Sequence, residues 1–169
     1  GVGSLGTTMN LCISSADDDS PNSPPSASTM PYQVKMENAS GPGGDFYLYL
    51  NGNTSATGSS RIRISVYHRD VLEGGGEEML TYGVYDSHSH LGQFRNCLDN
   101  GNNSDIRLSI SASEMSGKVS GSYEGTLALT ATGGSSGTAT DMDTFRLSVI
   151  IQAGPEVQIS SLNDLSLGS

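Results

Sequence analysis

The chain has no tryptophan, only two cysteines and few basic residues among its 169 positions. Eight lysines and arginines stand against 18 aspartates and glutamates, so the formal net charge is -10. An acidic field of this kind repels nucleic acid and anionic lipid, and we expect neither as a partner. No apolar run approaches the roughly 18 residues that a membrane span needs, so we expect no membrane insertion.

Residues that favour long helices are also scarce. Hydrophobic residues make up 34% of the chain, below the roughly 45–50% that is typical of globular domains. Glycine is abundant, with 22 residues, and serine and threonine are common. This composition favours short strands joined by many turns over helices. We therefore expect an all-β fold.

Alternation of apolar and polar residues runs through most of the chain and is interrupted by turn signals. The clearest strand spans residues 61–67, where we expect Ile62, Ile64 and Val66 to face inward. Asn51-Gly52 is typical of a tight turn. Short alternating strands at regular spacing predict an antiparallel β-sandwich.

A segment rich in glycine, serine and threonine over residues 133–143 predicts a flexible linker, which separates a body of residues 1–132 from a tail. An apolar strand over residues 144–152 follows, with alternate positions at Phe145, Leu147, Val149 and Ile151. An extended apolar segment on a tether can complete the edge of a sheet and fill pockets below it. The alternative is an ordinary last strand of the sandwich.

Cys12 and Cys97 are too few for a four-ligand zinc site and form no Cys-x-x-Cys motif. We expect a disulfide between them, with a pair of free thiols as the alternative. In the chain-entropy model, closing such a loop is worth ~4 kcal/mol. A disulfide implies an oxidising compartment, such as the periplasm or the exterior of the cell. No secretory leader is recognisable, so we expect a mature chain.

Catalytic motifs are scarce, and we expect neither an enzyme nor a bound cofactor or metal. No Gly-x-Ser-x-Gly elbow is present to position a nucleophile. Asp86, His88 and His90 could bind a transition metal weakly if they lay on one strand, but we expect a polar, exposed loop. His68 stands at a strand end, where we expect it in solvent. We also expect the acidic run Asp17–Asp19 to be solvated, because it lacks the spacing of a calcium-binding hand.

The segment from Asn96 to Thr130 combines a cysteine before an Asn/Gly turn, an alternating strand and a closing Gly-x-Tyr-x-Gly-Thr-Leu-x-Leu strand. These features are Cys97, Ile106–Ile110 and Gly121–Leu129. Near the start, Leu11-Cys12-Ile13 is similar to a half-cystine element with the same arrangement. Together they resemble the spore coat protein U family, which includes the pilins of archaic (Csu-type) chaperone–usher fimbriae.

Pilins of that family are immunoglobulin-like β-sandwiches that lack one strand, and the donor strand of the next subunit completes them. The resemblance implies that residues 144–152 are such a donor strand. Its positions are Phe145, Leu147, Val149 and Ile151. The candidates for the lining of the receiving groove are Ile106, Leu108, Ile110, Tyr123, Leu127 and Leu129. The resemblance also implies that a Cys12–Cys97 disulfide staples the sandwich.

The last part of the tail, residues 153–169, resembles the opening strand of the family. Within it, Val157–Gly168 matches the strand that normally precedes the element around Cys12. The resemblance therefore implies that the chain order is permuted, spliced across two subunits, or a truncated tandem repeat. The resemblance leaves open whether the 144–152 strand acts on its own chain or on a neighbour.

The resemblance implies a structural subunit of a bacterial surface fibre, a pilus, that serves adhesion or biofilm formation. The implied partners are identical or related pilin subunits, with a periplasmic chaperone and an outer-membrane usher during assembly. The implied location is an extracellular fimbrium, reached through the periplasm. A spore-coat or matrix protein is a further option within the family. The alternative from another class is a secreted tip adhesin or lectin-like binding module that uses the 86–90 or the 17–31 loop.

Overall fold

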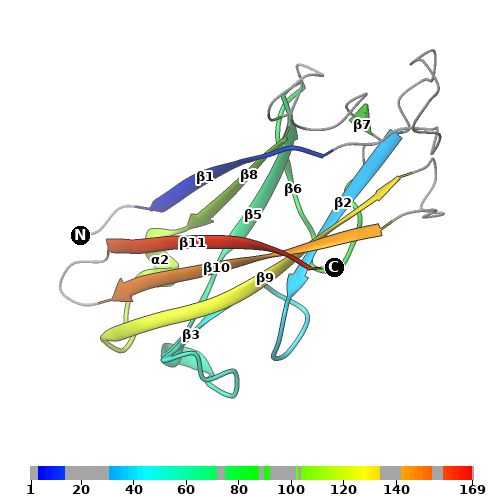
Figure 1. Cartoon of the computed structure of the whole chain (residues 1–169). Coiled ribbons are helices and arrows are strands. Elements are labelled where there is room, and N and C mark those ends of the chain that lie inside the picture. The colour runs from blue at the N-terminus through cyan, green and yellow to red at the C-terminus, as the bar shows by residue number, and fades with distance from the viewer. Residues whose placement is uncertain are drawn as a thin grey trace, which may run out of the picture.

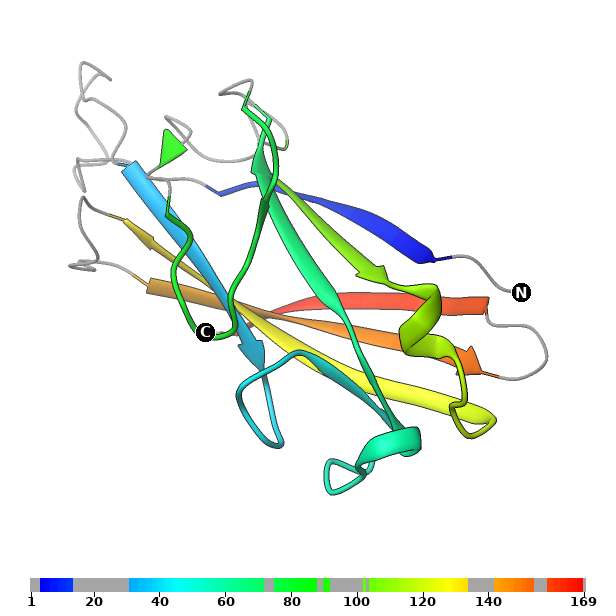
Figure 2. The ribbon, with the colours of Figure 1, turned by 180° about the vertical axis from the view of Figure 1, so that it is seen from behind.

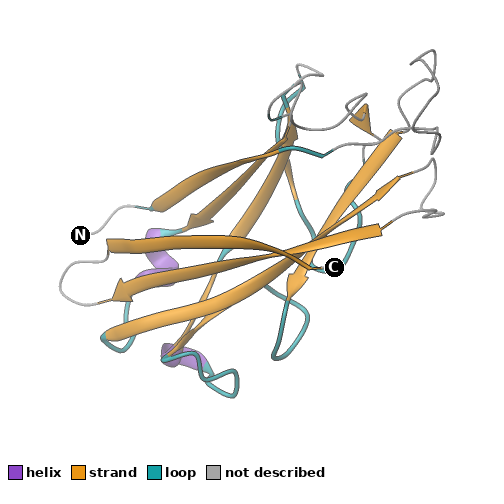
Figure 3. Cartoon of the chain, viewed as in Figure 1, coloured by secondary structure: helices purple, strands orange, loops and turns teal. Residues whose placement is uncertain are grey.

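The structure is a computed structural model that describes residues 4–13, 31–71, 75–87, 90–91, 102, 104–133, 142–153 and 158–168. The first sheet contains β1 (Leu5–Leu11), β5 (Ser65–Asp70), β6 (Glu78–Met79) and β8 (Ser104–Ile110). The second contains β2 (Pro31–Asn38), β3 (Tyr47–Leu50), β4 (Arg61–Arg63), β7 (His90–Leu91), β9 (Gly121–Gly133), β10 (Met142–Ala153) and β11 (Gln158–Gly168). Both sheets are antiparallel, and the two layers form an all-β sandwich (Figures 1 and 3). The expected all-β class is confirmed.

The strand order of the first sheet is β1-β8-β5-β6, and that of the second is β11-β10-β9-β2-β7. β3 pairs with both β9 and β4 beside this path. β1 and β11 are thus terminal strands of the two sheets, and they run along the same side of the sandwich (Figures 1 and 2).

One hydrophobic core lies between the two sheets. Successive side chains of a strand alternate between its faces, and the inner face of each layer supplies the core. On β8 the apolar inward positions are Ile106, Leu108 and Ile110, all buried. The second sheet contributes buried side chains that include Val34, Met36, Leu48, Leu127 and Leu129.

The alternating segment 61–67 is divided between the two sheets. β4 pairs with β3 in the second sheet, whereas β5 pairs with β8 and β6 in the first. The change occurs at Ile64, whose backbone N–H donates to the carbonyl of Phe46 at 2.9 Å. Ile62, Ile64 and Val66 are all buried, as expected. The alternation continues across the change of sheet because both sheets cover the same core.

Asn51-Gly52 forms the tight turn that its sequence predicts. The two residues have φ values of 53° and 70°, a region that asparagine and glycine adopt more readily than other residues. The Gly52 N–H donates to the carbonyl of Tyr49 at 3.0 Å, and the Asn51 N–H donates to that of Ser122 at 2.7 Å. The turn therefore keeps the loop after β3 beside β9.

Helical structure in the described residues consists of the 3-10 turn η1 (Gly58–Ser60) and the single-turn helix α2 (Ala112–Met115). Ser111 caps α2, since its hydroxyl accepts from the Glu114 N–H at 3.2 Å, as in a Ser-x-x-Glu capping box. The composition predicts no substantial helix, and α2 is only a connection between β8 and β9. No helix in this part of the chain has the length and apolar character needed to cross a membrane.

The tail supplies two strands of the second sheet. β10 pairs with β9, and β11 pairs with β10. The ladders continue into both ends of the predicted 133–143 linker, where Gly133 stands opposite Tyr32 and Met142 opposite Thr132. Both ends of that segment therefore belong to strands. Residues 134–141, the rest of the predicted linker, lie outside the described residues.

Candidate functional site

The ladder between β9 and β10 is the structural counterpart of the predicted donor strand. Met142–Ala153 stands opposite Gly121–Thr132 without a shift in register. The opposed positions are Phe145 and Leu129, Leu147 and Leu127, Val149 and Gly125, and Ile151 and Tyr123. Leu129, Leu127 and Tyr123 are buried in the core, so the four positions of β10 share the core-side register of β9. Their side chains are outside the described part of the structure, and their role as a donor strand stays a prediction.

The groove-lining candidates are all buried but divide between the two sheets. Tyr123, Leu127 and Leu129 lie on β9, the strand that pairs with β10. Ile106, Leu108 and Ile110 lie on β8 in the opposite sheet. A groove left by β10 would therefore have its edge at β9 and its apolar floor across the core at β8.

Two glycines of the closing strand allow β3 to approach β9 closely. A Cβ atom at Gly125 would lie 2.8 Å from both Leu48 Cδ2 and the Tyr47 carbonyl oxygen. A Cβ at Gly121, whose φ is +148°, would lie 2.7 Å from Leu50 Cδ1. These contacts are shorter than a real Cβ atom tolerates, so the glycine spacing of this strand has a packing reason beside the family resemblance.

Of the two cysteines, the structure describes Cys12. Cys12 follows β1 and is disulfide-bonded, and no described cysteine is free. Cys97 lies outside the described residues. Its role as the partner of Cys12 stays a prediction that follows from the cysteine count.

A network of buried polar side chains joins the two sheets, and it was not expected from the sequence. His68 and Asp70 on β5, Ser104 on β8 and Asp86 before β7 are all buried, as is Tyr32 on β2. The Tyr32 hydroxyl donates to Asp70 Oδ2 at 2.6 Å and lies 2.9 Å from Ser104 Oγ. Because β2 belongs to the second sheet and β5 and β8 to the first, these bonds hold the layers together at one end of the sandwich.

The expected solvent exposure of His68 and Asp86 is wrong. His68 Nδ1 lies 3.1 Å from Asp86 Oδ2, and Nε2 lies 3.2 Å from Ser104 Oγ. The other Asp86 oxygen accepts from the Val34 N–H at 2.9 Å. The 86–90 loop is therefore anchored by its first residue. His88 lies outside the described residues, and among those described no group of three or more His, Cys, Asp or Glu could hold a metal ion.

The connection Ser104–His68–Asp86 has the order of a catalytic triad, but its surroundings favour a structural role. Ser104 is 0% exposed, and the Tyr32 hydroxyl shares its Oγ. A nucleophile must be within reach of its substrate, and a serine enclosed between two sheets is not. The network instead supplies partners for polar groups that burial would otherwise leave unsatisfied.

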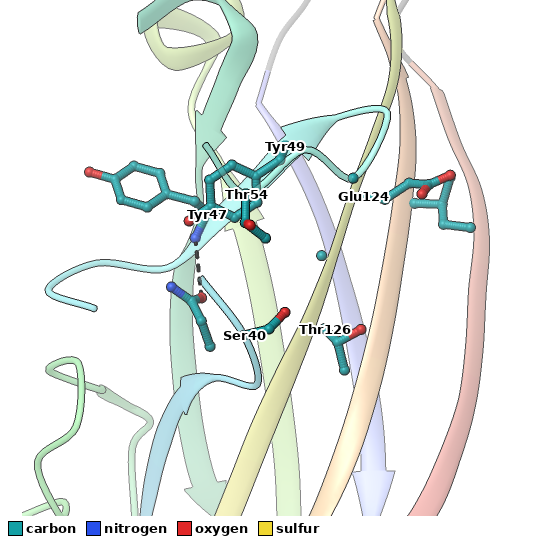
Figure 4. Close-up of a pocket in the computed structure, with 10 residues that line it drawn as sticks. Ser40, Tyr47, Tyr49, Thr54, Glu124 and Thr126 are labelled. Atoms are coloured by element: carbon teal, nitrogen blue, oxygen red, sulfur yellow. Dashed lines mark hydrogen bonds between the residues drawn. The ribbon is translucent and has the colours of Figure 1, made fainter. Parts of the chain in front are cut away.

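A cavity of about 310 Å³ lies against the outer face of the second sheet (Figure 4). Strand β9 supplies Glu124 and Thr126, which alternate with the buried core residues Tyr123 and Leu127. The rest of the wall comes from Gly125 of the same strand, from the end of β2, from β3, from the turns after β2 and β3, and from β10. Its described residues are Asn38, Ser40, Tyr47, Tyr49, Gly52, Thr54, Gly125 and Ile150.

Asn38 holds the turn that borders this cavity. Its Nδ2 group donates to the carbonyls of Pro42 and Asp45 at 2.9 and 2.8 Å. Its Oδ1 atom accepts from the Tyr47 N–H at 3.5 Å (Figure 4). The side chain thus ties the end of β2 to the start of β3, and one wall of the cavity is fixed by bonds within the chain.

Two tyrosines of β3 differ in their surroundings. The Arg61 guanidinium lies 4.0 Å from the centre of the Tyr47 ring and holds it by a cation–π contact. Tyr49 is 2% exposed. Its hydroxyl is the one buried side-chain nitrogen or oxygen in the described part of the chain without a hydrogen-bond partner. Burial raises the pKa of Tyr49, against a smaller opposite effect of Arg61, so at neutral pH the hydroxyl stays protonated and can donate.

Comparison of the sequence with protein-family models and with curated proteins finds no match. The resemblance to the spore coat protein U family therefore rests on the cysteine elements and the closing strand. Membership of that family stays a hypothesis, and the fold and the described contacts carry the functional argument.

Proposed function

We propose that the chain is a structural subunit of a bacterial surface fibre, assembled by donor-strand complementation of an immunoglobulin-like sandwich. The observation that carries this proposal is the unbroken ladder between β9 and β10. Twelve residue pairs join Met142–Ala153 to Gly121–Thr132. Besides β9, the only other ladder of β10 in the described residues is with β11, which follows it in the chain.

Removal of β10 would leave a sandwich with an open edge. β9 would lose the hydrogen-bonding partner along one whole side, and an unpaired edge is a template for another strand. The core-side residues Tyr123, Leu127 and Leu129 would gain exposure. Four apolar side chains inserted from a donor strand would contribute about 1.5–3 kcal/mol each, before the entropic cost of ordering the tether.

The same strand can complete its own chain or a neighbouring copy. Within this single chain β10 pairs with its own β9. Exchange of an identical element between copies needs no new contacts, because each copy offers the same edge and the same strand. The proposed fibre is therefore a chain of copies in which each β10 occupies the edge of the next copy.

The proposed partners are identical or related subunits. A periplasmic chaperone and an outer-membrane usher would cover the open edge during export, and the proposed location is the cell surface. In this role the fibre serves adhesion or biofilm formation. The Cys12 disulfide fits the oxidising compartment that this route requires.

The first test is a denaturing detergent gel of the full chain, with unheated and boiled samples side by side. We expect a high-mass ladder that collapses to one band on boiling, because strand exchange gives slowly dissociating assemblies. Leu147→Asp should abolish the ladder, since Leu147 stands opposite the buried Leu127. The neighbouring Ser148→Asp should keep it. A single monomer band for the unaltered chain contradicts the fibre and favours the binding module.

A second test distinguishes exchange between copies from completion within one chain. Thr126 and Ser148 stand directly opposite each other in the ladder, at a spacing that suits a disulfide. Copies with Thr126→Cys and copies with Ser148→Cys are mixed, unfolded and refolded together. We expect a disulfide-linked pair of chains, and far less of it when Gln152→Cys replaces Ser148→Cys. Equal yields in the two mixtures contradict exchange in this register.

A further inference from the structure

We propose that the cavity on the outer face of the second sheet binds a neutral, hydroxyl-rich ligand of the size of one or two sugar rings. This inference does not depend on fibre assembly, because the cavity is bordered by β3, β9 and two turns of the body. Among the described lining residues, Ile150 alone comes from β10. The same surface would be present in a monomer and in an assembled copy.

The size of the cavity limits the ligand. A volume of about 310 Å³ stands at the small end of the roughly 300–1,000 Å³ range of ligand pockets. A single sugar ring fits such a space, and a second ring can extend from the open side. A long peptide or a lipid chain needs a groove of greater length.

Three side-chain hydroxyl groups of the lining are available to bond a ligand. Ser40, Thr54 and Thr126 each place a side-chain hydroxyl at the cavity, from three different segments of the chain (Figure 4). No hydrogen bond within the described residues engages these three hydroxyls. Each can donate and accept, which matches the hydroxyls of a sugar. Ile150 is the one aliphatic side chain among the described lining residues, and an apolar ligand would leave the hydroxyls buried without partners.

The charges near the cavity favour a neutral ligand. Glu124 is exposed and is the only charged residue among the described residues that line it. One carboxylate repels phosphate and carboxylate ligands but accepts well from neutral O–H groups. A cationic ligand is disfavoured as well, because the Arg61 guanidinium already lies on the Tyr47 ring.

The hydroxyl of Tyr49 is a further observation that points to a ligand. It is buried among the lining residues and lacks a partner. A buried unpaired donor is costly, and a ligand oxygen that reaches it through a shift of the adjacent Gly41 turn would accept from it. The Gly41 backbone lies against this hydroxyl, since a Cβ at Gly41 would be 3.4 Å from it and 3.0 Å from Thr54 Cβ. Tyr49 and Thr54 are thus held together under the same turn.

The experiment is a titration of the full chain with N-acetylglucosamine and with methyl galactoside, followed by backbone amide NMR shifts. We expect saturable shifts, with a dissociation constant of about 1–10 mM because few polar contacts contribute, for at least one of the two sugars. The shifts should be confined to residues 38–54, 122–127 and 149–151, the segments that line the cavity. Thr126→Val and Glu124→Gln should each weaken binding about fivefold, the expected loss for one hydrogen bond.

Glu77→Gln is the matched control, because Glu77 is exposed, lies just before β6 of the other sheet and pairs with Arg107 of β8. It should leave the affinity unchanged. Absence of saturable shifts with both sugars overturns the proposal, and so do shifts outside these three segments or equal affinities for all variants. Ethanolamine is the cationic probe, and binding of ethanolamine but of neither sugar also overturns it. The gel ladder is measured without sugar, so failure of either proposal is visible separately.

Discussion

His68 Nδ1 lies 3.1 Å from Asp86 Oδ2, and both side chains are fully enclosed. The two residues are 18 positions apart, and Asp86 also accepts from the Val34 backbone. One carboxylate therefore connects β5 of the first sheet with β2 of the second. The stability of the sandwich should depend on this connection more than on any exposed ion pair.

Asp86→Ala tests that dependence. The variant leaves the Val34 N–H and the His68 ring without their acceptor, and unsatisfied buried groups cost about 1–3 kcal/mol each. We expect the free energy of unfolding to fall by about 2–5 kcal/mol, measured by urea denaturation. Asp105→Ala removes the more exposed pair with Arg69 and should cost less than about 1 kcal/mol. Equal losses for both variants would refute a special role for Asp86.

Gly125→Ala tests the close approach of β3 and β9. The new methyl group would lie 2.8 Å from Leu48 Cδ2 and from a backbone oxygen that cannot move alone. We expect a loss of about 1–3 kcal/mol, as for other overpacked sites. Gly76→Ala is the control, because a Cβ there meets nothing within 4 Å. Thermal unfolding of both variants provides the comparison, and an unchanged midpoint for Gly125→Ala contradicts the packing argument.

A pair of Tyr→Phe variants distinguishes a satisfied hydroxyl from an unsatisfied one. The Tyr123 hydroxyl donates to the Val119 carbonyl at 2.6 Å and also lies 3.0 Å from that of Ser59. Tyr123→Phe should therefore lose about 1 kcal/mol of stability. Tyr49→Phe removes a buried hydroxyl without a partner and should leave stability unchanged or raised. Denaturant titration gives both values, and the reverse order would contradict the assignment.

The pair Glu77–Arg107 predicts a small dependence of stability on pH. The hydrogen bond from Arg107 lowers the pKa of Glu77. Because the folded-state pKa is the lower one, the stabilisation is present above the unfolded pKa of about 4.3 and is lost as the pH falls through the folded value. Both groups are partly exposed, so the effect should stay below about 1 kcal/mol.

Acid unfolding of Glu77→Gln and of the unaltered chain measures this effect. The unaltered chain should be the more stable of the two at neutral pH, and the difference should vanish in acid. A difference that grows as the pH falls would contradict the sign.

The alternation in the sequence predicts more of the fold than the turn signals alone. The inward positions Ile62, Ile64 and Val66 continue without a break to His68 and Asp70, and all five are buried. The period therefore contained the signal for the polar network. The expectation that His68 is exposed followed from its polarity and not from its position in the alternation. Its partner Asp86 lies 18 residues further along the chain, too far for a local pattern to indicate. The sequence gives no sign of the change of sheet at Ile64, because the same alternation suits a strand of either sheet.

The sequence does not predict the cavity, for a different reason. Its lining residues come from β3, β9, β10 and two turns, and only the register of the strands brings Glu124 and Tyr49 together. From the sequence, the alternative binding module was expected to use the 86–90 or the 17–31 loop. Residues 17–30 lie outside the described part of the chain, so that alternative stays a prediction.

The amide of Asn38 has a practical consequence for producing the protein. Asn38-Ala39-Ser40 is an acceptor sequence for N-linked glycans, yet both Nδ2 bonds of Asn38 are used inside the chain. A glycan attached at Nδ2 would replace one of these N–H groups and loosen the turn from Pro42 to Asp45. Material secreted by a glycosylating eukaryotic host should therefore have a distorted outer face, and bacterial expression is the suitable source for the binding experiments.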